Sequence, residues 1–142
     1  IAESLQGLKS IVDAFRLLSE EIIVQEYFKT KPKNSDIRLF VFCDTIIGSV
    51  RRINTHDFRS NAHCGGKMEV FDPDESLINL ALETSQALET EFCAVDILSN
   101  GKDHRVLEVN ISPGIENLEK QTPLKPFVKL ADTIYRCACQ EN

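Results

Sequence analysis

The chain has 142 residues, of which 42% are hydrophobic and 27% are charged. This is the composition of one globular domain, and it excludes a disordered tail, a collagen-like fibre and a coiled coil. A net charge of −6 argues against a nucleic-acid partner, and no apolar run approaches the ~20 residues of a membrane-spanning helix. Five cysteines without a C-x-x-C pair indicate a reducing, cytoplasmic environment.

The first third of the chain predicts one helix followed by strands. Apolar residues recur at helical spacing over residues 3–19. Runs of β-branched and aromatic residues predict strands at residues 22–27, 37–43 and 45–53. A tight turn near Asp44 joins the last two strands, which indicates an antiparallel hairpin.

The middle of the chain predicts a polar loop and a second helix. Residues 54–69 have little hydrophobic periodicity, and a loop of this length in a compact domain is usually functional or disordered. The next helix begins with Asp72 as the cap, Pro73 at the first helical position and Glu75 completing a capping box. It extends to about residue 89.

The last third predicts a second hairpin and a final helix. Strands at residues 92–98 and 105–109 are joined by an Asn100-Gly101 turn, and Pro126 opens the last helix. The predicted order is α-β-β-β-α-β-β-α. It indicates an α+β fold, with a mainly antiparallel sheet and flanking helices.

The second hairpin carries the most informative side chains. If its turn is centred near Lys102, Asp96 lies opposite Glu108, and Asn110 shares the face of Glu108. Opposed like charges destabilise a sheet, and carboxylate and amide oxygens suit Mg²⁺, so the pattern predicts a metal site. The alternative is a solvated hairpin whose acids face water. The opposite face would be apolar, formed by Val95, Ile97, Leu107 and Val109.

Two other segments carry weaker signals. In the polar loop, Arg59 offers a guanidinium for a phosphate, beside Ser60, Asn61 and two glycines. The alternatives there are an incidental surface loop, or a Cys64 nucleophile beside His63. Residues 25–28 end a predicted strand, where exposed backbone could bind a base edge.

Taken together, these segments resemble the C-terminal part of an ATP-grasp ligase of the ribosomal-protein-modifying α-L-glutamate ligase type. The resemblance extends from the first helix to the last. It rests on five motifs in order: V-Q-E-Y-F at 24–28, D-I-R at 36–38, F-R-S-N-x-H-x-G-G at 58–66, V-D-I-L at 95–98, and L-E-V-N-x-S-P-G at 107–114.

The resemblance implies ATP-dependent ligation of a carboxylate to an amine through an acyl phosphate, with ATP and two Mg²⁺ ions, or Mn²⁺ in their place. It implies that Asp36 contacts the nucleotide and that Arg59 also steadies the acyl phosphate. Arg38 and His63 would lie near phosphate or substrate. The implied nucleotide-binding residues are Gln25, Glu26, Tyr27, Phe28, Asp36, Arg59, Ser60 and Asn61; the implied metal ligands are Asp96, Glu108 and Asn110.

The resemblance also implies parts that this chain does not carry. The family has an N-terminal domain and a small lobe with a glycine-rich lid, so we expect residues 1–24 to end the small lobe and residues 25–142 to form the C-terminal lobe. We therefore expect this segment alone to be inactive. The implied partners are ATP, an amino acid such as glutamate, and a carboxylate acceptor that is a protein C-terminus or a small molecule. Formation of a homo-oligomer is left open.

A second function remains open beside the ligase. The chain could be a non-catalytic nucleotide- or cation-binding module, or an interaction module, derived from an ATP-grasp fold. The acidic hairpin also makes an expectation about stability. If Asp96 and Glu108 repel each other without a cation, Asp96→Asn should be neutral or stabilising in metal-free buffer.

Overall fold

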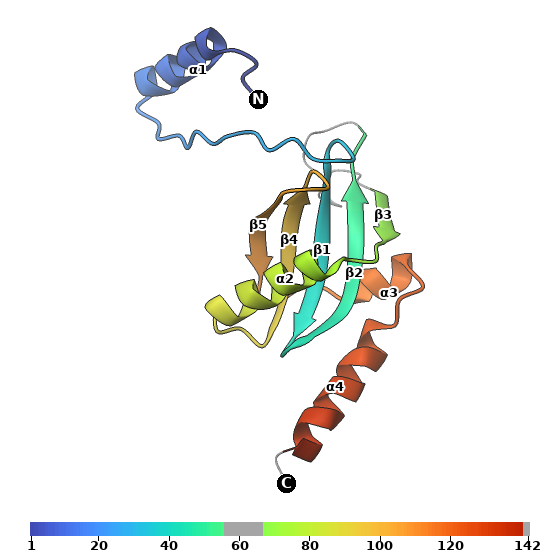
Figure 1. The fold of residues 1–142 in the computed structure, drawn as a ribbon. Helices are drawn as coiled ribbons and strands as arrows, with labels where there is room; N and C mark the ends of the chain where they lie inside the picture. Colours follow the sequence, from blue (N-terminus) through green and yellow to red (C-terminus); the bar gives the residue numbers. More distant parts are fainter. Residues whose placement is uncertain (56–66, 141–142) are drawn as a thin grey trace.

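The computed structural model describes residues 1–55 and 67–140 (Figure 1). Five strands form one sheet, and helices lie on both of its faces. The helices are α1 (Leu5–Leu17), α2 (Glu75–Ala87), α3 (Glu116–Gln121) and α4 (Pro126–Gln140). The strands are β1 (Ser35–Phe42), β2 (Thr45–Ile53), β3 (Lys67–Val70), β4 (Phe92–Ser99) and β5 (His104–Asn110).

The sheet has the strand order β3-β2-β1-β4-β5, and every neighbouring pair is antiparallel. Two predicted hairpins, β1–β2 and β4–β5, supply four of its strands. The first has a two-residue turn in which Cys43 adopts a positive φ of 50°, the backbone conformation that closes tight hairpins. The two hairpins then join through β1 and β4. The predicted α+β fold with a mainly antiparallel sheet is confirmed.

Each face of the sheet carries an apolar cluster, because successive side chains along a strand point to opposite faces. On the face covered by α2, Leu77 and Ala81 of the helix pack on strand residues that include Leu39, Val41 and Val95. The opposite face has the second cluster, which α3 and α4 cover. Its members are Phe40, Ile47, Val50, Ala94, Ile115 and Leu118, with Leu124 and Leu130 packed against them.

The structure corrects two predicted elements and adds one helix that the sequence did not predict. Residues 22–27 are not a strand: residues 20–30 form neither helix nor strand, and Ile23 is 88% exposed. β-Branched residues favour a strand only where a partner strand and a packing surface are present. The predicted loop at 54–69 ends instead in β3, which pairs with β2. Helix α3 was not predicted, since its six residues are too few for a periodic signal.

Helix α2 begins two residues later than predicted. Its N-cap is Asp74, whose Oδ1 accepts hydrogen bonds from the Leu77 backbone N–H at 3.0 Å and from the Ser76 hydroxyl. The predicted cap, Asp72, precedes it in the connection from β3. The aspartate pair around Pro73 made both positions plausible caps, and the tertiary position of the helix selects the second.

Helix α1 has its predicted position but no buried residue, although Leu5, Ile11 and Phe15 line one side of it. Figure 1 shows α1 lying apart from the sheet, at the end of a linker that leads into β1. Among the helices of the described residues, none is both long enough and apolar enough to cross a membrane.

Candidate functional site

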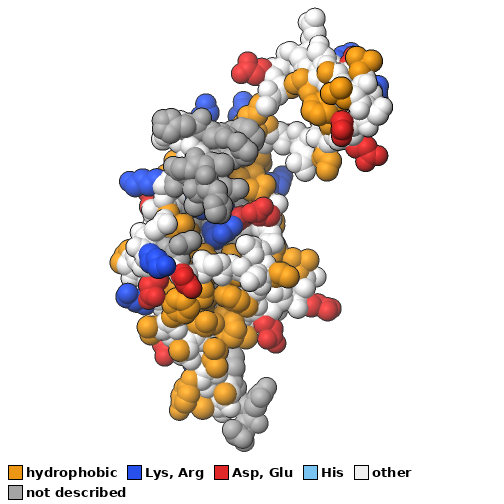
Figure 2. Space-filling view, turned by 180° about the vertical axis from the view of Figure 1, so that it is seen from behind, with side chains coloured by type: hydrophobic (Ala, Val, Ile, Leu, Met, Phe, Trp, Pro, Cys, Tyr) orange, Lys and Arg blue, Asp and Glu red, His pale blue; other side chains and the backbone are white. Residues whose placement is uncertain are grey.

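Five charged side chains from four strands meet on the sheet face that α3 and α4 partly cover. We call Asp36, Arg38, Arg52, Asp96 and Glu108 the charge cluster. The strand register brings them together: Asp36 pairs with Arg52, Arg38 with Asp96, and Asp96 with Glu108. Figure 2 views this face and shows acidic and basic side chains close together above an apolar region over α4.

Asp96 lies at the centre of the charge cluster and is completely buried. Its two oxygens accept separate hydrogen bonds from Arg38, Oδ1 from Nε and Oδ2 from Nη2, both at 2.6 Å. Oδ2 also accepts a hydrogen bond of 2.6 Å from Arg52. Charge-assisted bonds of this length are among the strongest in proteins. Two guanidinium groups therefore compensate the charge of Asp96.

Glu108 forms the open side of the charge cluster. Its side chain is 55% exposed, and its nearest cation is Arg38, at 3.8 Å between Nη2 and Oε1. The hydrogen bond and the negative charge of Asp96, together with partial burial, raise the pKa of Glu108. Proximity to Asp96 thus destabilises the ionised form of Glu108, and a cation placed between the two acids would relieve this repulsion.

The charges of Asp96 and Arg52 are stabilised despite their burial. Burial alone would raise the pKa of Asp96, but the hydrogen bond from Arg38 and the charges of Arg52 and Arg38 lower it. Burial alone would lower the pKa of Arg52, but its hydrogen bond to Asp36 and the charges of Asp96 and Asp36 raise it. These pKa directions keep both groups ionised across the physiological range.

The predicted pairing of Asp96 with Glu108 is confirmed, although the turn is not centred where the prediction placed it. Next to the turn, Ser99 pairs with His104, which centres the hairpin between residues 101 and 102. An irregularity between Asp96 and Ile97 then shifts the register by one residue. Leu107 is the extra residue of this β-bulge. It is 52% exposed, so the prediction that it faces the core is wrong.

The donor set on β4 and β5 fits a hard divalent cation. Asp96, Glu108 and Asn110 supply oxygen atoms from adjacent positions of two paired strands. The Asn110 Oδ1 accepts the Ser112 backbone N–H at 2.9 Å, which fixes the orientation of this amide. Within the described part of the chain, no group of three His, Cys, Asp or Glu side chains could hold a metal ion. A site on β4 and β5 would therefore depend on two carboxylates and one amide.

The structure places the predicted nucleotide-binding residues in three different situations. Asp36 is buried in the charge cluster, where its Oδ1 accepts a 2.6 Å hydrogen bond from Arg52. Gln25, Glu26 and Tyr27 are exposed in the linker before β1. Phe28 lies further along this linker. The Arg105 Cζ atom is over the Phe28 ring, 6.0 Å from the ring centroid.

Some predicted residues lie outside the described part of the chain. These are Arg59, Ser60 and Asn61, with His63 and Cys64 of the same loop.

Arg52 is the site residue that the sequence analysis missed. A signal for it existed, because a hairpin centred near Asp44 places Arg52 opposite Asp36. Its contact with Asp96 depends on the pairing of β1 with β4, strands that are far apart in sequence, and no local pattern predicts that pairing.

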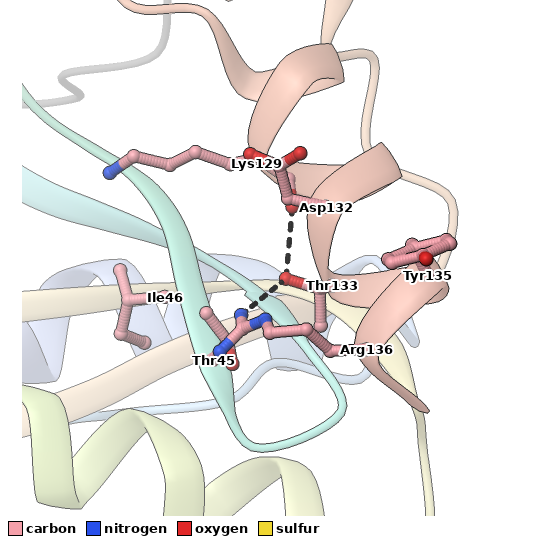
Figure 3. Close-up of a pocket in the computed structure, with 7 residues that line it drawn as sticks. All are labelled: Thr45, Ile46, Lys129, Asp132, Thr133, Tyr135 and Arg136. Atoms are coloured by element: carbon pink, nitrogen blue, oxygen red, sulfur yellow. Dashed lines mark hydrogen bonds between the residues drawn. The ribbon is translucent and has the colours of Figure 1, made fainter. Parts of the chain in front are cut away.

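A cavity lies at the other end of the sheet from the charge cluster, between the start of β2 and α4 (Figure 3). It has a volume of about 520 Å³ and is lined by Thr45, Ile46, Lys129, Asp132, Thr133, Tyr135 and Arg136. Arg136 donates to the Thr133 hydroxyl at 3.1 Å, and that hydroxyl donates to the Lys129 carbonyl. None of the residues that line this cavity belongs to the charge cluster.

Comparisons with known proteins agree with the fold. Over 98% of its length the chain resembles D-alanine–D-alanine ligase from Bacillus anthracis complexed with ATP, with a TM-score of 0.59 and 18% identity, covering 50% of that chain. It also resembles the ATP-grasp ligase PsnB complexed with minimal precursor, Mg and ADP, with a TM-score of 0.59 and 20% identity. That match covers 72% of this chain and 32% of PsnB.

Sequence comparison finds nearer relatives. The chain is 38% identical to the ribosomal protein bS6–L-glutamate ligase of Escherichia fergusonii over 142 residues, which are 99% of this chain and 47% of that protein. It is 37% identical to a probable alpha-L-glutamate ligase of Enterobacter sp. over 139 residues, 97% of this chain and 46% of that protein. The chain thus spans about half the length of the curated relatives it matches.

The antiparallel sheet with its flanking helices is the fold of an ATP-grasp lobe. Residues 1–134 match the RimK-like ATP-grasp domain, and the chain belongs to this family. The resemblance stated from the sequence motifs is therefore confirmed. Its relatives are ligases, glutamate ligases among them.

Proposed function

We propose that this chain is the C-terminal catalytic part of an ATP- and Mg²⁺-dependent carboxylate–amine ligase. The observation that carries the proposal is the juxtaposition of Asp96 and Glu108, two carboxylates on paired strands of an ATP-grasp sheet. The half-exposed carboxylate of Glu108, whose pKa is raised by Asp96, is the group most in need of a cation. Family membership supports the same chemistry independently.

The proposed reaction has two steps. A carboxylate oxygen of the acceptor attacks the γ-phosphorus of ATP, the bond to the β,γ-bridging oxygen breaks, and an acyl phosphate and ADP form. The amine nitrogen of the second substrate then attacks the acyl carbon, phosphate leaves with the bonding electrons, and the amine loses a proton. The amide bond is formed with ATP converted to ADP and phosphate.

The residues proposed to hold the metal are Asp96, Glu108 and Asn110. Two Mg²⁺ ions, or Mn²⁺ in their place, would offset the negative charge of the phosphates during phosphoryl transfer. Glu108 is the most exposed of the three acids in the charge cluster and would be the carboxylate most accessible to a cation. Arg38 lies beside Glu108 and would present its guanidinium to the transferred phosphoryl group.

The nucleotide is proposed to lie between the linker and the charge cluster. Residues 25–28 would contact the base, and Asp36 would contact the nucleotide from the start of β1. The exposure of Gln25, Glu26 and Tyr27 leaves them accessible for this role. Arg59, Ser60 and Asn61 remain proposed nucleotide contacts from the sequence motif, with Arg59 also steadying the acyl phosphate.

The substrates are proposed from the relatives and from the chemistry. Ligases named for ribosomal protein bS6 and L-glutamate are similar to this chain along its length. We propose glutamate as the amino acid, and a protein C-terminus or a small carboxylic acid as the acceptor, in the cytoplasm. Residues 1–24 are proposed to end a small lobe, which the exposed apolar side of α1 supports.

A second candidate function has one observation in its favour. Both oxygens of Asp96 already accept guanidinium hydrogen bonds, so the charge cluster is largely compensated within the chain. Such a cluster also suits a non-catalytic nucleotide-binding or interaction module.

Calorimetric titration of the chain with a non-hydrolysable ATP analogue, with and without Mg²⁺, tests the ligase proposal. Binding that requires Mg²⁺ and is lost in Glu108→Ala supports it. Glu83→Ala, a change at an exposed glutamate of α2, is the matched control and should bind as the unsubstituted chain does. Binding that ignores Mg²⁺ and both substitutions would favour the module instead.

A further inference from the structure

Arg52 connects two acids that have different proposed roles. Its Nε donates to Asp36 Oδ1 and its Nη2 donates to Asp96 Oδ2, each at 2.6 Å. Asp36 is a proposed nucleotide contact, and Asp96 is a proposed metal ligand. One planar guanidinium therefore joins the two halves of the proposed site.

The position of Arg52 in the sheet makes this connection rigid. Strand β2 is not a neighbour of β4, so the side chain reaches across β1, where Asp36 and Arg38 lie two residues apart on the same face. Arg52 is 4% exposed, and both acids are at most 1% exposed. Because all three groups are buried, we expect a change at one acid to alter the contact of the guanidinium with the other acid.

We propose that Arg52 is a positioning residue that couples the nucleotide side of the site to the divalent-cation side. This inference rests on the proposed function and adds a regulatory link within it. When the charge of Asp36 is neutralised, Arg52 loses one of its two anionic partners, and its attraction to Asp96 dominates. Asp96 then becomes a poorer cation ligand. A ligand group that draws Asp36 away from Arg52 would act in the same direction.

A lysine cannot make the same connection. Its ammonium group is a compact point charge, whereas arginine offers two donors in a fixed fork that matches two separate carboxylates. Arg52→Lys keeps the positive charge but removes the shared guanidinium. Comparing arginine with lysine at position 52 therefore distinguishes coupling through the guanidinium from the effect of the positive charge alone.

The test is a double-mutant cycle read by Mn²⁺ binding, with free Mn²⁺ followed by electron paramagnetic resonance in the absence of nucleotide. In the unsubstituted chain, Asp36→Asn should weaken Mn²⁺ binding on the order of tenfold, as loss of partners around metal ligands commonly does. In an Arg52→Lys background, the same substitution should change Mn²⁺ affinity by less than about threefold, and this difference is the coupling.

A neighbouring ion pair provides the matched control. Arg51 lies on the other face of β2, and its Nη1 is 3.6 Å from Glu69 Oε1. Glu69→Gln therefore removes the acid from an arginine–carboxylate ion pair outside the charge cluster. It should leave Mn²⁺ affinity within about twofold, because exposed charges are screened by salt. Circular dichroism confirms folding of each variant. If Asp36→Asn does not fold, the Mn²⁺ affinities with and without an ATP analogue are compared between Arg52→Lys and the unsubstituted chain.

The possible failures are distinguishable. If Mn²⁺ binds and Glu108→Gln weakens it, but Asp36→Asn has the same effect in both backgrounds, the coupling through Arg52 is wrong and the proposed metal site stands. An unchanged nucleotide effect on Mn²⁺ affinity in Arg52→Lys overturns the coupling in the same way. If the unsubstituted chain binds no Mn²⁺, or Glu108→Gln does not weaken binding, the proposed function fails and the inference fails with it.

Discussion

Asp96 and Glu108 face each other across β4 and β5, yet the two carboxylates have opposite electrostatic environments. Asp96 is buried between two arginines, and its pKa is lowered. Glu108 is half exposed, and its pKa is raised by Asp96. Two neighbouring acids whose pKa values shift in opposite directions are typical of a functional site. Here Asp96 is held in its ionised form, whereas the ionised form of Glu108 is destabilised by Asp96.

Glu108→Gln should stabilise the chain near neutral pH in metal-free buffer. Because the folded pKa of Glu108 is raised above its ordinary value, the repulsion is absent below that ordinary value and grows as pH rises through the folded pKa. Urea unfolding at about pH 4 and about pH 7 measures this, and the gain should appear only at the higher pH. An equal loss at both values would contradict the repulsion.

Asp96→Asn should destabilise the chain, which reverses the expectation drawn from the sequence. The charge of Asp96 is compensated by Arg38 and Arg52, so neutralising it leaves guanidinium groups short of a partner. Breaking a buried pair in this way costs about 3 kcal/mol. Since the pKa of Asp96 is lowered, its contribution is present above the ordinary aspartate pKa and is lost as pH falls through the folded value.

Urea unfolding in metal-free buffer at neutral pH decides between these two expectations for Asp96→Asn. Glu108→Gln is a useful companion, because it removes the facing carboxylate without breaking the arginine contacts of Asp96. A free energy of unfolding unchanged or increased by Asp96→Asn would show that the arginines do not stabilise this acid.

Asp74→Ala should lower the free energy of unfolding by about 1 kcal/mol, the usual cost of losing a helix N-cap. The matched substitution Asp72→Ala, at the cap predicted from sequence, should change it by less than about 0.5 kcal/mol. Hydrogen bonds from Ser76 and Leu77 lower the pKa of Asp74, so its contribution is lost as pH falls through that lowered value. Equal effects of the two substitutions on the free energy of unfolding would contradict the assignment of Asp74 as the N-cap of α2.

Two leucines provide a direct test of the core. Leu118 of α3 is 1% exposed and contacts the second apolar cluster, whereas Leu107 occupies the bulge of β5 and is 52% exposed. Leu118→Ala should cost about 2–5 kcal/mol of stability through the cavity it leaves. Leu107→Ala should cost less than about 0.5 kcal/mol. Thermal or urea unfolding of the two variants should separate them clearly. A large loss of stability in Leu107→Ala would contradict the exposed position of Leu107 in the bulge.

Features encoded by neighbouring residues were predictable from the sequence. Both hairpins follow from tight turns, and the facing of Asp96 and Glu108 follows from the second. The bulge beside Ile97 offset the error in the assumed turn centre, so this pairing was right while the orientation of Leu107 was wrong. Distance from the turn is a weak guide wherever a strand has an extra residue.

Features that depend on distant segments were not predictable in this way. The pairing of β1 with β4 joins residues 58 positions apart in the Arg38–Asp96 contact. The two acids were therefore predictable from the sequence, whereas their compensation by arginines was not, and a cation alone was expected to balance their charge. The predicted strand at residues 22–27 was wrong for a related reason. Strand propensity does not produce a strand where no partner strand is available.

The charge cluster draws its five members from β1, β2, β4 and β5, with no two strands able to supply it alone. If a cation binds at this cluster as proposed, its binding would report on the assembly of these four strands, and it would raise the midpoint of thermal unfolding of the chain. Helix α1 contributes no residue to the cluster and has no buried residue. Its unfolding would therefore not be detected by such a measurement.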